Sequence, residues 1–434
     1  MVLEPASQSR PQPAGAAPSH PHDARQRQIM VVAGEASGDL HAGGLVAELR
    51  RRHPGWQFFG CGGPRLGAAG SELLVQAREV TVVGLVEVLA HLPRIYRLHR
   101  RLRRAMRQRR PAAVILVDFP DFNLPLARAA ARRGIPVIYF ISPQVWAWRE
   151  RRVEIIRRTV RRMICIFPFE PAFYARHDIQ VEYVGHPLVE AARPRRTREA
   201  FFAQYGFRPQ VPLIALLPGS RRREIQHNLP PMLAAAAQLR QATGAQFVLP
   251  AAETVGLEWL GGTIPPAYRP LVRVVGGEAY DALAHAQLAI VASGTATVEA
   301  ALLRTPMVVV YRLSKYSYWL GRRWVRTPYF AMVNLIAGRE VVPELIQDRY
   351  QPEAVVNWAL KLLDDAGRRE DRPEGAPHPA CASGAASPRE LMLQGYEEVR
   401  RRLTPPTAAE VPSGVVSPWS RAAAAVESVL EELP

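Results

Sequence analysis

Cysteine is scarce in this sequence. The 434 residues include only three, Cys61, Cys165 and Cys381, and none forms a C-x-x-C pair. Widely separated cysteines in odd number give no signal for a disulfide framework or a zinc site. The composition therefore fits a reducing compartment such as the cytoplasm, and we expect neither a metal nor another cofactor.

Long hydrophobic runs are also missing. The longest uncharged stretches, such as Ala282 to Val298, contain His, Gln, Ser, Gly and Thr. Such a composition is typical of the core of an α/β protein and not of a membrane-spanning helix. Residues 1–28 are rich in proline and lack the apolar block of a secretory signal, so we interpret them as a disordered tail. The sequence indicates a soluble or peripheral protein.

Acidic residues are outnumbered by basic ones. The chain has 56 Lys and Arg against 39 Asp and Glu, which gives a net charge of +17, almost all of it from arginine. This excess favours anionic partners: phosphorylated substrates, nucleic acid or an acidic membrane surface. An arginine-rich, lysine-poor composition is also what a GC-rich genome produces, so only local clustering can identify a binding surface.

Short apolar runs alternate with amphipathic stretches from Ile29 onward. The runs are IMVVAG, AAVILVDF, PVIYFI and MICIFPF in a first series, and PLIALLPG, AQFVLPAA, VRVVGG, LAIVASG and PMVVVYR in a second. This alternation is typical of βαβ units on a parallel sheet. Because the chain exceeds one typical hydrophobic core, we predict two Rossmann-like, doubly wound α/β domains, residues 29–190 and 191–364.

The remaining carboxyl-terminal part lacks this alternation. Residues 365–388 have the composition of a flexible insertion, and Thr404 to Pro418 that of a linker. Helical periodicity within 389–434 predicts carboxyl-terminal helices, which could pack back on the first domain.

The stretch LLPGSRRREI joins an apolar strand to a helix through a glycine and an arginine. Gly219 allows the backbone to approach an anion, the amide that follows at Ser220 can point at it, and Arg221 offers a planar fork to phosphate oxygens. We predict a phosphate-binding turn. The alternative is an ordinary strand-to-helix turn with surface arginines.

The stretch IVASGTATVEAALL repeats this arrangement with Ser293, Gly294 and Thr295. Small residues leave the amino end of the next helix open, where amides and the helix dipole attract a diphosphate. Glu299 lies one turn inside that helix. A phosphate would repel this carboxylate, so we expect it to face a pair of sugar hydroxyls; the alternative is a favourable charge near a helix start.

Three carboxylates follow strands of the first domain. Glu35, in GEASGD, stands at the carboxyl end of a strand, where ligands of open α/β sheets bind. Asp118 and Asp121, in DFPDFN, end another strand with the rigid Pro120 between them. Asp121 could be a catalytic base or only a helix cap. A metal site is not indicated, because D-x-x-D differs from the D-x-D of metal-dependent transferases and no histidine is near.

Two regions combine apolar or aromatic residues with arginine. The apolar stretch Val80 to Leu98 precedes and overlaps Arg94 to Arg110, which holds nine arginines. We predict that Val83, Leu85, Val86 and Leu89 face a membrane, with a helix break at Pro93; the alternative is a core helix followed by a solvated basic helix. Arg149 to Arg162 has seven arginines after VWAW, but no nucleic-acid recognition module accompanies it, so acceptor phosphate or lipid headgroups are the expected anions.

Several of these stretches together resemble one family. GEASGD, GPRL, DFPDFN, SPQVWAWR, FPFE, VGHP, LLPGSR, SGTATVE and NLIAGRE are similar, in order and spacing, to lipid-A-disaccharide synthase over roughly residues 29–364. The resemblance implies a GT-B fold, with two Rossmann-like domains facing across a cleft, and an inverting, metal-independent glycosyltransferase. It also implies transfer of 2,3-diacylglucosamine from UDP to the 6-hydroxyl of 2,3-diacylglucosamine 1-phosphate at the cytoplasmic face of the inner membrane.

The resemblance also assigns roles to residues. It implies that Asp121 is the base, with Asp118 as its structural or electrostatic neighbour, and that Asn334 in NLIAGRE serves the nucleotide-sugar site. On sequence alone Asn334 could equally be a turn residue. The main competing function is a non-hydrolysing UDP-sugar epimerase of the same fold. A nucleic-acid-binding protein is the third possibility, but we expect no nucleic-acid binding. The sequence does not decide the oligomeric state, and a homodimer is compatible with it.

Overall fold

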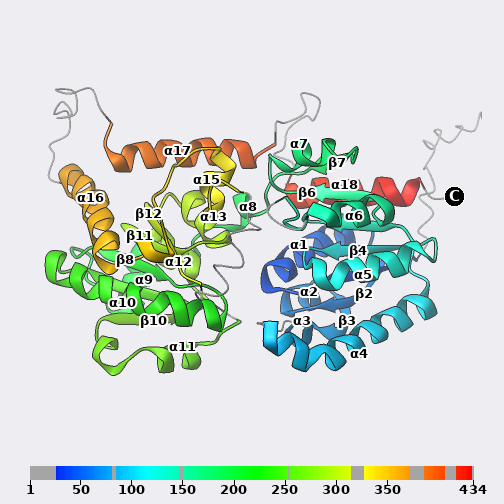
Figure 1. The fold of residues 1–434 in the computed structure, drawn as a ribbon, viewed down its shortest axis with the longest axis horizontal. Coiled ribbons are helices and arrows are strands. Elements are labelled where there is room, and N and C mark those ends of the chain that lie inside the picture. The colour runs from blue at the N-terminus through cyan, green and yellow to red at the C-terminus, as the bar shows by residue number, and fades with distance from the viewer. Residues whose placement is uncertain are drawn as a thin grey trace, which may run out of the picture.

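The chain folds around two parallel β-sheets that lie side by side (Figure 1). The computed structural model describes residues 26–80, 85–146, 150–252, 254–313, 327–370, 386–405 and 417–432. The first sheet has seven strands in the order β3-β2-β1-β4-β5-β6-β7, and the second has six in the order β10-β9-β8-β11-β12-β13. Both orders reverse direction at their first strand, which confirms the prediction of two doubly wound α/β sheets.

The elements of the first half alternate as the apolar runs predict. The strands are β1 (Gln28–Ala33), β2 (Gln57–Gly62), β3 (Ser71–Gln76), β4 (Ala113–Val117), β5 (Val137–Phe140), β6 (Arg162–Cys165) and β7 (Val181–Tyr183). The helices are α1 (Ala36–Arg52), α2 (Pro64–Ala68), α3 (Ala77–Val80), α4 (Leu85–Arg109), α5 (Pro120–Ala131), the 3-10 turn η1 (Glu150–Arg152), α6 (Val153–Thr159), α7 (Glu170–Ala175) and α8 (Leu188–Ala191).

The second half repeats the pattern. Its strands are β8 (Leu213–Leu217), β9 (Gln246–Ala251), β10 (Val272–Gly276), β11 (Leu288–Ala292), β12 (Met307–Tyr311) and β13 (Glu344–Ile346). Its helices are α9 (Arg198–Tyr205), α10 (Arg222–Thr243), α11 (Leu257–Thr263), η2 (Pro266–Tyr268), α12 (Ala279–His285), α13 (Thr295–Leu302), α15 (Met332–Ala337), η3 (Gln347–Arg349), α16 (Pro352–Glu370), α17 (Pro388–Leu403) and α18 (Pro418–Glu431).

Each face of the first sheet is covered by its own set of helices. Alternate residues of β1 point to opposite faces, so Ile29 and Val31 pack with α1 while Met30 and Val32 pack with α4, α5 and α6. Strands β4 and β8 are buried at every position, as expected where helices cover both faces of a parallel sheet.

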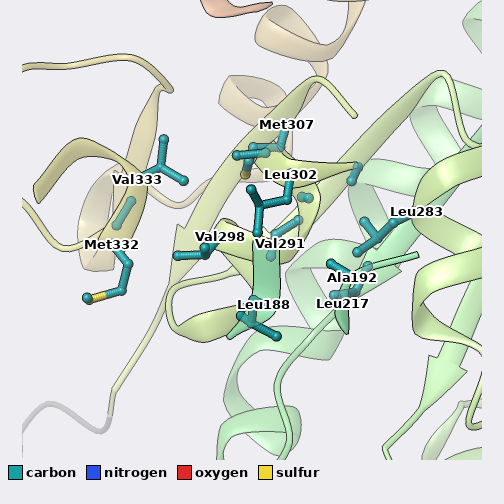
Figure 2. Packing of buried hydrophobic residues seen from close by; sticks show 14 of the residues in the cluster. Leu188, Ala192, Leu217, Leu283, Val291, Val298, Leu302, Met307, Met332 and Val333 are labelled. Carbon is teal, nitrogen blue, oxygen red and sulfur yellow. The ribbon is translucent and has the colours of Figure 1, made fainter. Parts of the chain in front are cut away.

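The connection between the two halves packs into the core of the second sheet. Figure 2 shows Leu188 and Ala192, from α8 and the residue after it, among Leu217, Val291 and Val298. Helix α8 contacts α13. The chain therefore passes from one sheet to the other through a packed segment, which limits how freely the two halves can move.

The last helix returns to the first half of the chain. Helix α18 packs on α1 and β6, where Arg52 donates to the Glu427 carboxylate at 2.8 Å and Arg27 donates to the Leu430 carbonyl at 2.9 Å. In Figure 1 this red helix lies beside β6, far in sequence from its neighbours.

Some predictions fall outside the described residues. Of the predicted tail, residues 1–25 are not described, and Gln28 already begins β1. Val83 is likewise not described, nor are the side chains of Leu85, Val86 and Leu89 in the first turns of α4. Helix α16 continues to Glu370, so the start of the predicted 365–388 insertion is helical.

The predicted helix break at Pro93 is wrong. Helix α4 runs from Leu85 to Arg109 with Pro93 inside it. Proline removes one main-chain hydrogen bond, but Leu98, Leu102 and Met106 pack the following turns against the sheet.

Among the described residues no helix is long and apolar enough to cross a membrane.

Candidate active site at the junction of the two sheets

The carboxyl ends of β1 and β8 meet through an ion pair. Glu35 precedes α1 in the cap position, yet its side chain makes no capping hydrogen bond. Its Oε2 instead accepts from Nη2 of Arg221, which precedes α10, at 2.7 Å. Because this pair joins residues from different sheets, it marks where the predicted acceptor and nucleotide sides of the site come together.

Asp118 ends β4 in a strained turn next to this ion pair. Asp118 and Phe119 both have positive φ, 44° and 48°, a conformation that non-glycine residues rarely adopt and that clusters at functional sites. The Asp118 carbonyl accepts hydrogen bonds from Nδ2 of Asn123 at 2.7 Å and from the Tyr139 hydroxyl at 2.6 Å. These two side chains hold the turn in place.

The turn also explains a glycine in the first motif. A Cβ on Gly34 would lie 2.2 Å from Cδ1 of Phe119. Only glycine at this position lets the Phe119 ring pack against the end of β1. GEASGD and DFPDFN are therefore parts of one structure.

The Asp118 carboxyl group has an unusual acidity. Its pKa is raised to about 7: burial is the largest cause, the negative charge of Glu35 acts in the same direction, and the Phe119 amide and Arg221 oppose both. A carboxylate that titrates near neutral pH can accept a proton from a hydroxyl and release it again.

Asp121 lies in different surroundings. It is in the first turn of α5, its side chain is 63% exposed, and it forms an ion pair with Arg152 of η1. The structure thus brings Asp118 and Glu35 together with Arg221 and places Asp121 on the solvent side of the same turn. A catalytic base needs hydrogen-bonded, partly desolvated surroundings. Asp118 meets this requirement better than Asp121.

The loop after β8 places Arg221 between two carboxylates, Glu35 and Glu224. Gly219 has a φ of 129°, and the exposed Ser220 that follows donates its amide to Glu224 at 3.3 Å. The Arg221 guanidinium also donates to Glu224, at 3.1 Å. In this structure two carboxylates therefore occupy the donors that a diphosphate would use.

The second predicted turn is open. Gly294 has a φ of 151° and caps α13, and a Cβ added there would meet no atom within 4 Å. Thr295 is exposed at the start of the helix, whereas the Ser293 hydroxyl donates to the Phe330 carbonyl at 2.7 Å. The open space over Gly294 and the helix amino end suit a phosphate.

Glu299 shares its helix with this turn. Its pKa is raised to about 7 by burial, which outweighs the opposing effect of a hydrogen bond donated by the Tyr280 hydroxyl. Tyr280 was not among the predicted residues, because its partner is distant in sequence. The pair suits recognition of a neutral group such as a hydroxyl.

Asn334 does not join these residues. Its side chain is fully buried, donates to the Val342 carbonyl and to Glu344, both at 2.9 Å, and accepts from the amides of Val341 and Val342. The Asn334 amide group fixes the turn before β13, and its predicted service to the nucleotide-sugar site stays a prediction.

Two buried carboxylates play a similar structural part in the first half. Asp39 accepts from the amides of Gly63, Arg65 and Leu66, which fixes the GPRL turn. Glu170 of FPFE accepts from the Phe167 amide at 2.9 Å, and burial raises its pKa to about 7. Asp39 lies in GEASGD and Glu170 in FPFE. Nothing in the spacing of these motifs distinguishes a residue that supports a turn from one that contacts substrate. Among the described residues no three His, Cys, Asp or Glu side chains gather as a metal site.

Known structures share this architecture at low sequence identity. The calicheamicin glycosyltransferase has a TM-score of 0.54 at 19% identity and covers 94% of this chain, 99% of its own. A UDP-GlcNAc 2-epimerase from Neisseria meningitidis has a TM-score of 0.57 at 11% identity and covers 87% of this chain, 99% of its own. At such identities the likeness concerns the fold alone, and it confirms the GT-B class.

Sequence comparison goes further. The family model for lipid-A-disaccharide synthetase matches residues 29–376. The lipid-A-disaccharide synthase of Solibacter usitatus is 47% identical over 80% of this chain and 91% of its own length. That of Myxococcus xanthus is 44% identical over 94% of this chain and 98% of its own. Because the family model and both relatives cover most of the chain, it belongs to the lipid-A-disaccharide synthase family, glycosyltransferases of lipid A biosynthesis.

Proposed function

We propose that the chain transfers 2,3-diacylglucosamine from UDP to the 6-hydroxyl of 2,3-diacylglucosamine 1-phosphate, with inversion, and releases UDP. The observation that carries this proposal is the position of Asp118. It is a carboxyl group with a pKa of about 7, and it lies in a strained turn beside the Glu35–Arg221 pair that joins the two sheets.

Asp118 acts as the general base. As the 6-hydroxyl oxygen attacks the anomeric carbon, Asp118 takes its proton, and the bond from that carbon to the diphosphate breaks on the opposite face of the sugar. Each transfer forms one C–O bond, breaks one, and leaves UDP and a protonated Asp118. Its pKa of about 7 allows that proton to leave again at neutral pH. The sequence-based assignment of this role to Asp121 stays a prediction that the same experiments test.

Arg221 and the turn at Gly294 bind the leaving diphosphate. Negative charge grows on the diphosphate as the glycosidic bond breaks, so donors aimed at it lower the barrier. Arg221 is held by Glu35 and Glu224 in the structure; the diphosphate displaces Glu35 as its partner. Ser220, Ser293 and Thr295 lie in the same two turns. Glu299 accepts hydrogen bonds from the ribose hydroxyls.

The epimerase alternative rests on fold likeness alone. An epimerase of this fold would act on the UDP-sugar without an acceptor, whereas the sequence relatives over most of the chain are synthases. The products distinguish the two functions.

The experiment is mass spectrometry of the products formed from UDP-diacylglucosamine with and without diacylglucosamine 1-phosphate. We expect the β-1,6-linked disaccharide 1-phosphate and UDP only when the acceptor is present. UDP release or an epimerised donor without acceptor would contradict the proposal.

The enzyme works at the cytoplasmic face of the inner membrane as a peripheral protein. The support is the apolar stretch from Val80 to Leu98 next to the arginines of α4, since acylated substrates reside in the bilayer. Leu85→Glu with Leu89→Glu should weaken liposome binding; unchanged binding would count against this location.

A homodimer stays a prediction, for which sedimentation equilibrium is the direct measurement.

A further inference from the structure

A groove of about 420 Å³ runs between α5 and α6, on the face of the first sheet that those helices cover. Four of the seven side chains that line it are arginines; the lining residues are Arg128, Arg132, Arg151, Glu154, Ile155, Arg158 and Thr159. The proposed transfer reaction uses none of them. We refer to this feature as the α5–α6 groove.

The α5–α6 groove carries positive charge that the described part of the chain does not neutralise. Arg128, Arg132 and Arg151 are exposed and have no carboxylate partner among the described residues. The only acidic lining residue, Glu154, is already paired with Arg158 and, at 2.9 Å, with Arg157. The groove therefore offers three free guanidinium groups, which suit phosphate oxygens.

The groove extends away from the transferase site. Asp118 lies at the carboxyl end of β4, and α5 runs from that edge of the sheet back toward the opposite edge. Arg128 lies in the last turn of α5 and Arg132 just beyond it, whereas Arg158 lies in the last turn of α6. Arg151 lies at the other end of the groove, in η1, next to Arg152, which pairs with Asp121. An anion held by Arg128, Arg132 and Arg158 would not occupy the place of the reacting hydroxyl or of the UDP.

The positive charge continues onto the neighbouring helix. Helix α5 packs against both α4 and α6, and Figure 1 shows the three side by side over the first sheet. On α4, Arg97, Arg101 and Arg104 are exposed at helical spacing, beside the stripe of the buried Leu98 and Leu102. The layer formed by the three helices thus presents one extended basic face.

We propose that the α5–α6 groove binds the phosphate groups of anionic phospholipids, so that this basic face lies against the membrane. The inference deepens the proposed function, on which it rests, because it specifies how an enzyme with acylated substrates is held at the bilayer. A site for one soluble phosphate would need enclosed donors. These guanidinium groups are exposed and spread along an open groove, as contact with several headgroups requires.

The test compares two variants of the full chain with the same loss of charge. In the groove variant, Arg128, Arg132 and Arg151 are each replaced by Gln. In the control variant, the exposed Arg273, Arg400 and Arg401 of the second half are each replaced by Gln. Binding is measured to phosphatidylcholine vesicles with and without phosphatidylglycerol at fixed salt. The unfolding midpoint of each variant shows whether the arginines only stabilise helix ends.

An arginine near an anionic surface increases affinity about fivefold. Phosphatidylglycerol increases the vesicle affinity of the wild type, and this increase should be smaller by a factor on the order of 100 in the groove variant. The control variant should lose little. Equal losses in both variants, no loss in the groove variant, or a loss that follows a lowered unfolding midpoint would overturn the proposal.

Two further arms separate other anions from lipid. Inorganic phosphate should release the protein from vesicles no better than chloride of equal ionic strength, and a single-stranded oligonucleotide should bind more weakly than the vesicles. The opposite result in either arm would reassign the groove. Transfer between detergent-solubilised substrates should be the same in wild type and groove variant. If wild type itself forms no disaccharide, the proposed function fails while the vesicle result stands.

Discussion

Asp118 combines backbone strain with a desolvated carboxyl group, and both destabilise the folded chain. Its side chain would bind a proton in the folded state up to a pH of about 7, whereas an unfolded aspartate releases it near pH 4. Between those values the folded state holds more protons than the unfolded state. Stability contributed by this group is therefore present below about pH 4 and is lost as pH rises toward 7.

This pH dependence predicts a stabilising substitution. Asp118→Asn removes the charge and should stabilise the folded state. The difference in free energy of unfolding between variant and wild type should be about 1–3 kcal/mol larger at pH 8 than at pH 5. Chemical denaturation at both pH values measures the difference. A variant whose advantage is constant or shrinks over this interval would show that Asp118 titrates normally.

Which of the two aspartates lies beside the Glu35–Arg221 pair could not be predicted from their spacing. The left-handed backbone at Asp118 and Phe119 depends on Asn123 and on Tyr139 of the next strand, and this is a tertiary effect that local sequence does not encode. Asn334 shows the same limit, because its motif position is compatible with either a ligand contact or a buried turn. By contrast, Gly219, Arg221 and Gly294 follow from strand-to-helix turns that the apolar pattern already locates.

At the scale of elements, the contact between α1 and α18 ties the end of the chain to the first sheet. A Cβ on Gly44 would lie 2.4 Å from Cε2 of Trp419, so the glycine allows the two helices to pack closely. The alternation of apolar runs predicts most strands and helices, since burial sets both. It does not predict that α4 continues through Pro93, because packing on the sheet compensates for the lost hydrogen bond.

Gly44→Ala should therefore destabilise the protein by about 1–3 kcal/mol, since the added methyl group must displace the indole ring. Gly262→Ala in α11 is the matched control, because a Cβ there meets no atom within 4 Å and alanine favours a helix. Free energies of unfolding measured for both would contradict the packing argument if the two substitutions had the same effect.

At the scale of the whole molecule, the Glu35–Arg221 ion pair couples the two sheets. Both side chains are partly exposed, so the pair itself contributes at most about 1 kcal/mol to stability. Its larger effect is on the site: Glu35 raises the pKa of Asp118 and occupies a donor of Arg221.

Glu35→Gln should consequently change two measurements. The midpoint of the pH dependence of kcat/KM should move to lower pH, because a negative charge next to Asp118 is removed. Calorimetry should show tighter UDP binding, because a competing anion has gone. A midpoint that stays or rises, or a weaker UDP affinity, would refute this coupling.

The most direct test of the account compares turnover in Asp118→Asn and Asp121→Asn with UDP affinity measured in parallel. If Asp118 is the base, Asp118→Asn should lower kcat by about 10²- to 10⁴-fold with UDP affinity nearly unchanged, and Asp121→Asn should retain most of the activity. Near-wild-type turnover in Asp118→Asn, with turnover lost in Asp121→Asn, would contradict it.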